Sequence, residues 1–227
     1  MKKIMGLVFG VMFLLSAGLA YAIPSLQLDI EGGIYDFSTQ TVIATSKEFS
    51  LYAYLIPDNK VGLSTPLFIS AALVPQTSSE PSVGSFCFAG TTVAVTEGMM
   101  VGGPALLPPH GIFDTSYIAF PVSFLGALQI APYNTQDRAI SGDPIVLSGT
   151  GMFYREFEVD VTGLSEGYNI HFDLYGYYTG ASGKTQIEFA PFSHDAQSNG
   201  NKVPEPSTLL LLGAGLVGLY GLRRKMR

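Results

Sequence analysis

Alternation of apolar and polar residues is the main signal in the central part of this chain. In its clearest stretch, residues 153–161, apolar side chains alternate with Glu156, Glu158 and Asp160. After a turn that contains two glycines, residues 168–175 alternate in the same way. A period of two is typical of a strand with one buried and one solvated face. We therefore predict that these two stretches form an antiparallel hairpin with one face in the core.

Shorter runs of β-branched and aromatic residues predict further strands. They cover residues 26–30, 41–45, 49–56, 67–74, 91–96, 117–125 and 186–189. No segment of ten to fifteen residues has a helical period, and Gly and Pro are scattered throughout. The pattern predicts an all-β domain over residues 23–192, an antiparallel β-sandwich that is jelly-roll-like. Two irregular stretches, 97–114 and 132–151, interrupt it, and residues 193–202 read as a polar linker.

The N-terminus has the three parts of a secretory signal peptide. Lys2 and Lys3 form a positive region, residues 4–19 are apolar, and Ala20-Tyr21-Ala22 is a small-residue cleavage site. We predict that signal peptidase removes residues 1–22. The alternative is an uncleaved N-terminal anchor.

The C-terminus combines a short motif, an apolar span and a basic end. The motif is Val203, Pro204, Glu205, Pro206 and Ser207, and the basic cluster is Arg223, Arg224, Lys225 and Arg227. The uncharged span 207–222 would cover roughly 24 Å as a helix, slightly less than a bilayer core. Snorkelling basic side chains would close the gap, and the positive-inside rule keeps them in the cytoplasm. We predict a single transmembrane helix with the preceding chain outside the inner membrane.

This arrangement over residues 203–227, with its motif at 203–208, resembles the PEP-CTERM sorting signal of Gram-negative bacteria. The resemblance implies that the inner membrane holds the protein transiently and that an exosortase cleaves near the motif. The mature protein would then reach the cell surface or extracellular matrix. The alternative is an ordinary C-terminal anchor that stays uncut.

Segments across the central domain also resemble the choice-of-anchor N family of exported bacterial proteins. They are residues 26–33, 51–57, 131–137, 171–175 and 189–195. The resemblance implies surface display and brings no enzymatic activity with it.

Charge narrows the range of partners. Between the two end segments, six basic and seventeen acidic residues remain, a net charge of −11. Such a surface repels nucleic acid and attracts cations and basic surfaces. Cys87 is the only cysteine, so the chain forms no intrachain disulfide.

Candidate sites are few. The acidic row Glu156, Glu158 and Asp160 is a candidate calcium site on the predicted strand face, although calcium needs six to eight oxygens. Tyr175, Tyr177 and Tyr178 are a candidate sugar-stacking platform, against which the absence of Trp argues mildly.

Neither the histidines nor the one triad-like run predicts a site. His110, His171 and His194 form no close-spaced pair, so the sequence predicts no zinc site. The adjacent residues of Ser193-His194-Asp195 are not expected to form a catalytic triad. We therefore predict a non-enzymatic surface or matrix protein, structural or adhesive in the exopolysaccharide layer. We predict no cofactor, and calcium is the one candidate ion. The alternatives are a carbohydrate-binding module and a calcium-binding adhesion domain.

Overall fold

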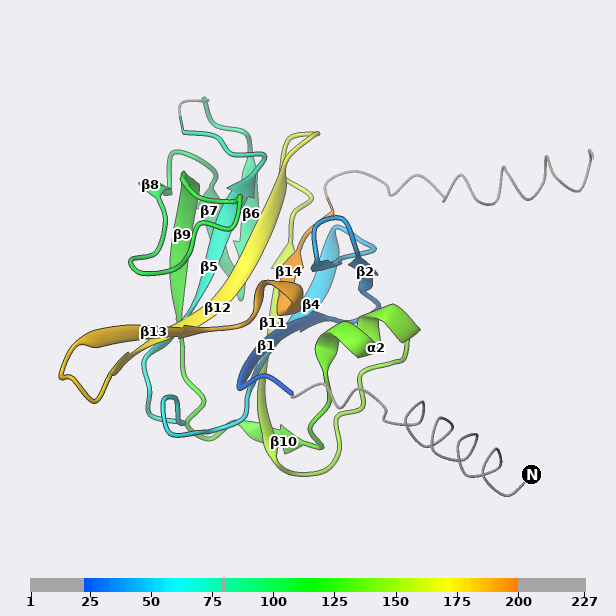
Figure 1. Cartoon of the computed structure of the whole chain (residues 1–227). Helices are drawn as coiled ribbons and strands as arrows, with labels where there is room; N and C mark the ends of the chain where they lie inside the picture. The colour runs from blue at the N-terminus through cyan, green and yellow to red at the C-terminus, as the bar shows by residue number, and fades with distance from the viewer. Residues whose placement is uncertain (1–22, 79–80, 200–227) are drawn as a thin grey trace, which may run out of the picture.

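Fourteen β-strands make up nearly all of the regular secondary structure in the residues that the structure describes, 23–78 and 81–199 (Figure 1). The structure is a computed structural model. The predicted signal peptide and the whole predicted sorting signal lie outside the described residues. The strands form two sheets that face each other across the core, which confirms the predicted β-sandwich.

The first sheet has six strands in the order β1-β4-β11-β6-β7, with β10 paired to β11, and all of its pairs are antiparallel. Its strands are β1 (Leu26–Ile30), β4 (Glu48–Leu55), β6 (Ser85–Phe88), β7 (Thr91–Ala94), β10 (Leu128–Ile130) and β11 (Met152–Asp160).

The second sheet has eight strands in the order β2-β3-β14-β12-β5-β9-β8, with β13 paired to β12. Its pairs are antiparallel except for β3 and β14, which run parallel, a feature that the sequence pattern did not predict. Its strands are β2 (Ile34–Asp36), β3 (Thr41–Ile43), β5 (Leu67–Val74), β8 (Met100–Gly102), β9 (Thr115–Val122), β12 (Asn169–Thr179), β13 (Thr185–Phe189) and β14 (Asp195–Gln197). Figure 1 shows the C-terminal end of β12 and its partner β13 extending together away from the body of the domain.

The predicted hairpin between residues 153–161 and 168–175 is wrong. The two stretches do become strands, β11 and β12, but β11 pairs with strands of the first sheet and β12 with strands of the second. The turn between them therefore crosses from one sheet to the other. Both strands direct apolar side chains into one core from opposite sides. The alternation of apolar and polar residues therefore identified two real strands, but these strands do not pair with each other.

The predicted solvated face of the second stretch is also wrong. His171 and Asp173 on β12 are 1% and 2% exposed. That face is covered by the loop 103–114 between β8 and β9, whose His110 lies against His171. A short 3₁₀ helix, η1 (Phe192–His194), backs the loop, since Phe192 stacks on His110. Strand β12 is thus buried on both faces along its middle, as a central strand usually is.

Two stretches without clear periodicity contain regular structure. The helix α2 (Thr135–Ser141) lies in the stretch expected to be irregular, with Asn134 accepting a hydrogen bond from the Asp137 amide as its N-cap. Residues 195–197, expected to belong to a linker, form β14 inside the second sheet. Among the described residues, no helix is long and apolar enough to cross a bilayer.

A glycine fixes the approach of β6 to the turn after β11. Gly84 has a φ of +105°, and an added Cβ would lie 2.1 Å from the carbonyl oxygen of Gly163. Gly84→Ala is therefore expected to lower the free energy of unfolding by about 2 to 4 kcal/mol through strain and overlap. The control is Gly90→Ala, where φ is +79° but no atom lies within 4 Å of the added Cβ. It should cost only about 1 kcal/mol in denaturant unfolding, and equal losses for the two variants would contradict this account.

Candidate functional site

The candidate site is a cluster of four side chains in the second sheet, called here the His/Asp cluster. It consists of His110, His171, Asp173 and Asp195. His110 comes from the loop 103–114, the next two residues lie on β12, and Asp195 begins β14. Segments that are far apart in the sequence therefore supply its members.

Strand register explains why three of the four meet. His171 and Asp173 are two residues apart on β12, so their side chains leave the same face of the sheet. The antiparallel register of β12 and β14 places Asp195 beside Asp173. On the other side of β12, β5 places Ser70 opposite Asp173, and the Ser70 hydroxyl donates to Asp173 Oδ2 at 2.8 Å.

The donor atoms of the His/Asp cluster converge. The Nε2 atoms of His110 and His171 lie 3.5 Å apart. Oδ1 of Asp173 is 3.1 Å from the first of these and 3.6 Å from the second. Oδ2 of Asp195 is 3.7 Å from the first and 3.6 Å from the second. All four atoms lie within 4.8 Å of one another.

The cluster is buried, and much of its hydrogen-bonding capacity is unused. The side chains of His171, Asp173 and Asp195 are at most 2% exposed, and that of His110 is 9% exposed. Four buried atoms form no hydrogen bond with any described residue: His171 Nδ1, Asp173 Oδ1 and both carboxylate oxygens of Asp195. Buried polar atoms are usually paired, so such a concentration in one place needs an explanation.

Burial and mutual charge together set the ionisation of the cluster. Burial acts to lower the pKa of His171, but the carboxylates of Asp173 and Asp195 outweigh it and raise that pKa to about 10. Burial and the charge of Asp173 raise the pKa of Asp195 to about 7. Burial works against ionisation of Asp173, yet the two imidazoles hold the pKa of its carboxyl below the usual value. The four groups therefore act as one coupled unit.

The loop holds His110 in a defined orientation. Its ring stacks on Phe192 with the centroids 3.8 Å apart, and its φ of +31° is uncommon for a residue other than glycine. Nδ1 of His110 lies 3.0 Å from the carbonyl oxygen of Pro108. A carbonyl only accepts, so Nδ1 carries the proton, and the lone pair of a neutral ring is then on Nε2, which faces the cluster.

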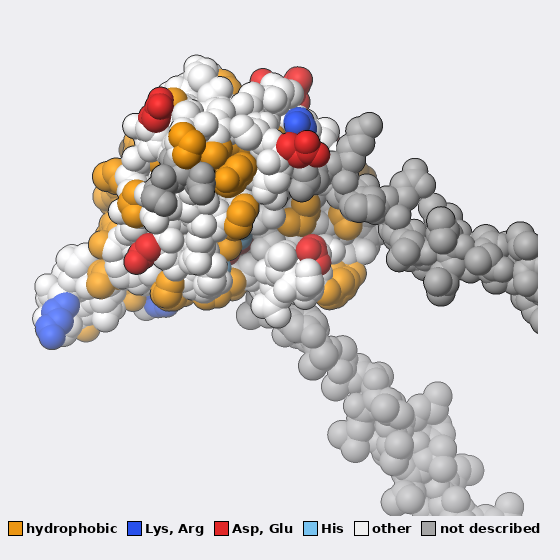
Figure 2. Space-filling view, turned by 90° about the horizontal axis from the view of Figure 1, so that it is seen from above, with side chains coloured by type: hydrophobic (Ala, Val, Ile, Leu, Met, Phe, Trp, Pro, Cys, Tyr) orange, Lys and Arg blue, Asp and Glu red, His pale blue; other side chains and the backbone are white. Residues whose placement is uncertain are grey.

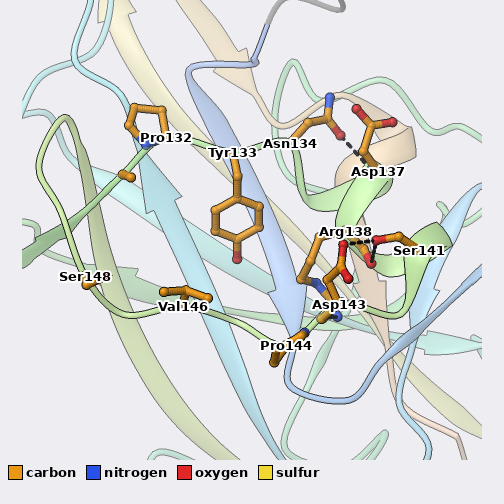
Figure 3. A pocket seen from close by; sticks show the side chains of 11 residues that line it. Pro132, Tyr133, Asn134, Asp137, Arg138, Ser141, Asp143, Pro144, Val146 and Ser148 are labelled. Atoms are coloured by element: carbon orange, nitrogen blue, oxygen red, sulfur yellow. Dashed lines mark hydrogen bonds between the residues drawn. The ribbon is translucent and has the colours of Figure 1, made fainter.

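A second feature is a pocket of about 520 Å³ beside α2 (Figure 3). Tyr133 precedes α2 and Arg138 lies on it, whereas Pro144 and Val146 belong to the segment that follows the helix. The side chain of Arg138 is 5% exposed, and its guanidinium donates to acceptors within the protein. Arg138 therefore has little capacity left to bind a ligand in this pocket.

The partner of Arg138 is Asp29 on β1. Nε and Nη2 of Arg138 donate to the two Asp29 oxygens at 2.7 and 2.5 Å. The hydroxyl of Tyr133 also reaches this carboxylate at 3.0 Å and lies 2.6 Å from the hydroxyl of Tyr54. This buried network fastens α2 and the residues before it to the first sheet.

The acidic row predicted as a calcium site lies along β11. Glu156 and Glu158 are exposed and both accept from the hydroxyl of Ser50, at 2.8 and 3.3 Å. Asp160 instead accepts from the amide of Thr162 at 2.7 Å. Two members thus share one neighbour while the third caps a turn, and calcium binding there stays a prediction. The space-filling view shows acidic side chains at several places on the face turned to the viewer, not gathered into one patch (Figure 2).

The three tyrosines predicted as a stacking platform do not share one face of β12. Tyr175 and Tyr177 lie on one face and Tyr178 on the other, since side chains alternate along a strand. Tyr175 is 3% exposed and stacks on Phe68 with the centroids 5.7 Å apart. The Tyr177 hydroxyl donates to the carbonyl oxygen of Ala105 at 2.9 Å. Packing and loop attachment therefore account for two of the three rings.

Residues 193–195 differ from the sequence prediction in one contact. The hydroxyl of Ser193 lies 2.8 Å from Nδ1 of His194, so these adjacent side chains do contact each other. Nε2 of His194 lies 3.2 Å from Oδ1 of Asn134, and Asp195 turns into the His/Asp cluster. The three side chains do not form the chain of contacts that a triad needs.

Sequence reasoning missed the His/Asp cluster. The available signal was His171 and Asp173 at strand spacing, but that face was expected to be solvated. The sequences around His110 and Asp195 show no alternation of apolar and polar residues, so nothing indicated that these residues lie beside β12. The prediction that the histidines do not converge is thus wrong for His110 and His171.

Comparison with protein families identifies the C-terminal segment. A family model described as the PEP-CTERM protein-sorting motif matches residues 202–225. The chain carries a PEP-CTERM sorting motif. This confirms the sequence prediction and implies an exported protein that an exosortase processes and that is sorted to the cell surface. A search of curated proteins finds no match to the chain, and the choice-of-anchor N resemblance of the core stays a prediction.

Proposed function

We propose that this chain is a non-enzymatic protein of the cell surface or extracellular matrix, in which the β-sandwich is a structural or adhesive unit of the exopolysaccharide layer. The observation that carries the proposal is the PEP-CTERM motif at residues 202–225. The motif directly follows the folded domain, because β14 ends at Gln197. Cleavage near the motif would release the sandwich as an intact unit.

The polar sites of the domain support a structural role. The donors of Arg138 beside the pocket are used inside the protein, and Tyr175 is packed against Phe68. The acidic charge of the domain favours cationic partners over nucleic acid. A panel of glycans and esters should accordingly yield no product, and product formation by the purified chain would contradict the non-enzymatic assignment.

The sorting step is tested by the mature C-terminus in the native host. Intact mass of the protein from membrane and extracellular fractions should show an extracellular form that ends near Pro204. Glu205→Ala should keep the full tail and accumulate in the membrane, with the extracellular fraction reduced roughly tenfold or more, because the variant loses a residue expected to position the scissile bond.

The matched control is Asn201→Ala, which lies just before the matched residues and should be released like the wild type. A wild-type protein found only in the membrane, with its tail intact to Arg227, would overturn the proposed surface function. Equal release of the two variants would show that the motif is not read by a processing enzyme.

A further inference from the structure

We propose that the His/Asp cluster is a zinc site in which His110, His171, Asp173 and Asp195 each supply one ligand. The inference is independent of the proposed function, because it rests on the side chains of the folded domain and not on the sorting motif. Its role is structural, since all four ligand positions come from the protein and the site is buried.

The spacing of the donor atoms matches tetrahedral zinc. Ligand atoms at about 2.0 to 2.1 Å from a tetrahedral ion lie roughly 3.3 to 3.4 Å from one another. The five nitrogen–nitrogen and nitrogen–oxygen separations in the cluster run from 3.1 to 3.7 Å. A small movement of side chains would close the set around one ion.

The donor types and the charge point to the same class of ion. Two imidazole nitrogens and two carboxylate oxygens suit zinc among the divalent metals, whereas calcium takes six to eight oxygens. Coordination requires both imidazoles to be neutral, so an incoming metal displaces the protons that the carboxylates otherwise hold on them. The two carboxylates then leave a net charge of −2, which a divalent cation neutralises. Neutrality matters because an uncompensated charge is costly in a buried site.

Hydrogen bonds around the cluster resemble those that orient metal ligands. The Nδ1 proton of His110 is directed to the Pro108 carbonyl, which leaves Nε2 free to bind a metal. Ser70 holds Oδ2 of Asp173, so Oδ1 faces the other ligands. Neither carboxylate oxygen of Asp195 accepts a hydrogen bond from a described residue, and coordination to a metal would give one of them a partner.

Such an ion would fasten the end of the domain. It joins β12, the loop 103–114 and β14, the last strand before the sorting motif. The chain has one cysteine, so an intrachain disulfide cannot make this link. A metal that binds the folded but not the unfolded chain adds its binding free energy to stability.

The test measures metal binding by the full chain, purified in detergent and stripped with a chelator. Dialysis against micromolar zinc chloride followed by elemental analysis should give about one zinc per chain. Cobalt(II) in its place should produce the visible absorption of a tetrahedral site. Chelation should lower the melting temperature by roughly 10 °C. A folded wild-type chain that retains neither zinc nor cobalt would overturn the proposal.

Variants identify the ligands. His110→Gln removes a loop ligand and should weaken zinc binding by roughly 100-fold or more. The matched control is His194→Gln. His194 precedes the proposed ligand Asp195 in the sequence, but its ring contacts Asn134 and not the cluster, so this variant should bind zinc as the wild type does. Circular dichroism establishes that each variant is folded. Wild-type affinity in folded His110→Gln would refute the assignment.

Ser70→Ala keeps the proposal testable if His110→Gln fails to fold. Ser70 is a positioning residue that holds Asp173 and is not itself a ligand. Its removal should weaken zinc binding about tenfold while leaving one site per chain. An unchanged zinc affinity in this variant would count against coordination by Asp173.

Discussion

Arg138→Met is expected to lower the free energy of unfolding by about 3 to 5 kcal/mol, because it leaves the carboxylate of Asp29 buried without its cation. Asp29 is completely buried, and both of its oxygens accept from the guanidinium. Met fills much of the same volume, so the loss reports on charge more than on packing. Urea unfolding of the two proteins at neutral pH measures it.

Two further variants separate the charge effect from others. Arg155→Met removes a guanidinium that donates to the carbonyl oxygens of Ser123 and Leu125 at the surface, and should cost no more than about 1 kcal/mol. Asp29→Asn combined with Arg138→Met removes both charges and should be more stable than Arg138→Met alone. A double variant as unstable as the sum of the single ones would argue against a paired charge.

The pH dependence of the Arg138→Met deficit gives an independent check. Burial raises the pKa of Asp29 to about 6, although Arg138 opposes the shift. An acid whose pKa is raised by folding binds its proton more tightly in the folded state, so its contribution to stability falls as pH rises through about 4 to 6. Without Arg138 the carboxylate is still harder to ionise. The deficit of the variant should therefore be larger at pH 8 than at pH 5, and a pH-independent deficit would contradict this mechanism.

The sequence predicted strands well where apolar residues dominate. Residues 26–30 and 67–74 coincide with β1 and β5, since both strands face the core and their composition shows it. Pairing was not predictable in the same way. Alternation shows which side chains share a face, but it does not say which sheet a strand joins, so β11 and β12 looked like neighbours.

The His/Asp cluster could not be predicted for a related reason. A polar residue on an alternating strand looks solvated unless something covers that face. Here the cover is a loop with several prolines, against which a three-residue 3₁₀ helix packs, and neither segment has a periodic pattern. The C-terminal motif was predictable because its information is local and needs no tertiary contact.

Phe88→Ala is expected to cost about 3 to 5 kcal/mol, the range for removing a large side chain from a well-packed core. Phe88 on β6 is 3% exposed and lies between the two sheets. Its ring stacks on Phe120 of β9 at 4.3 Å and on Phe157 of β11 at 5.2 Å, and lies 6.2 Å from that of Phe172 on β12. One side chain therefore connects β6 and β11 of the first sheet to β9 and β12 of the second.

Two controls show whether this contact between the sheets is the cause. Phe88→Leu keeps most of the apolar volume but loses the ring stacking, so it should fall between the wild type and Phe88→Ala. Phe37→Ala removes the same side chain from a position that is 71% exposed, and should change stability by about 0.5 kcal/mol or less. Denaturant melts of the three variants give the comparison. If Phe88→Ala were as mild as Phe37→Ala, then the two sheets must be held together by other contacts, such as those of Phe86 or Phe124, and not by the Phe88 stack.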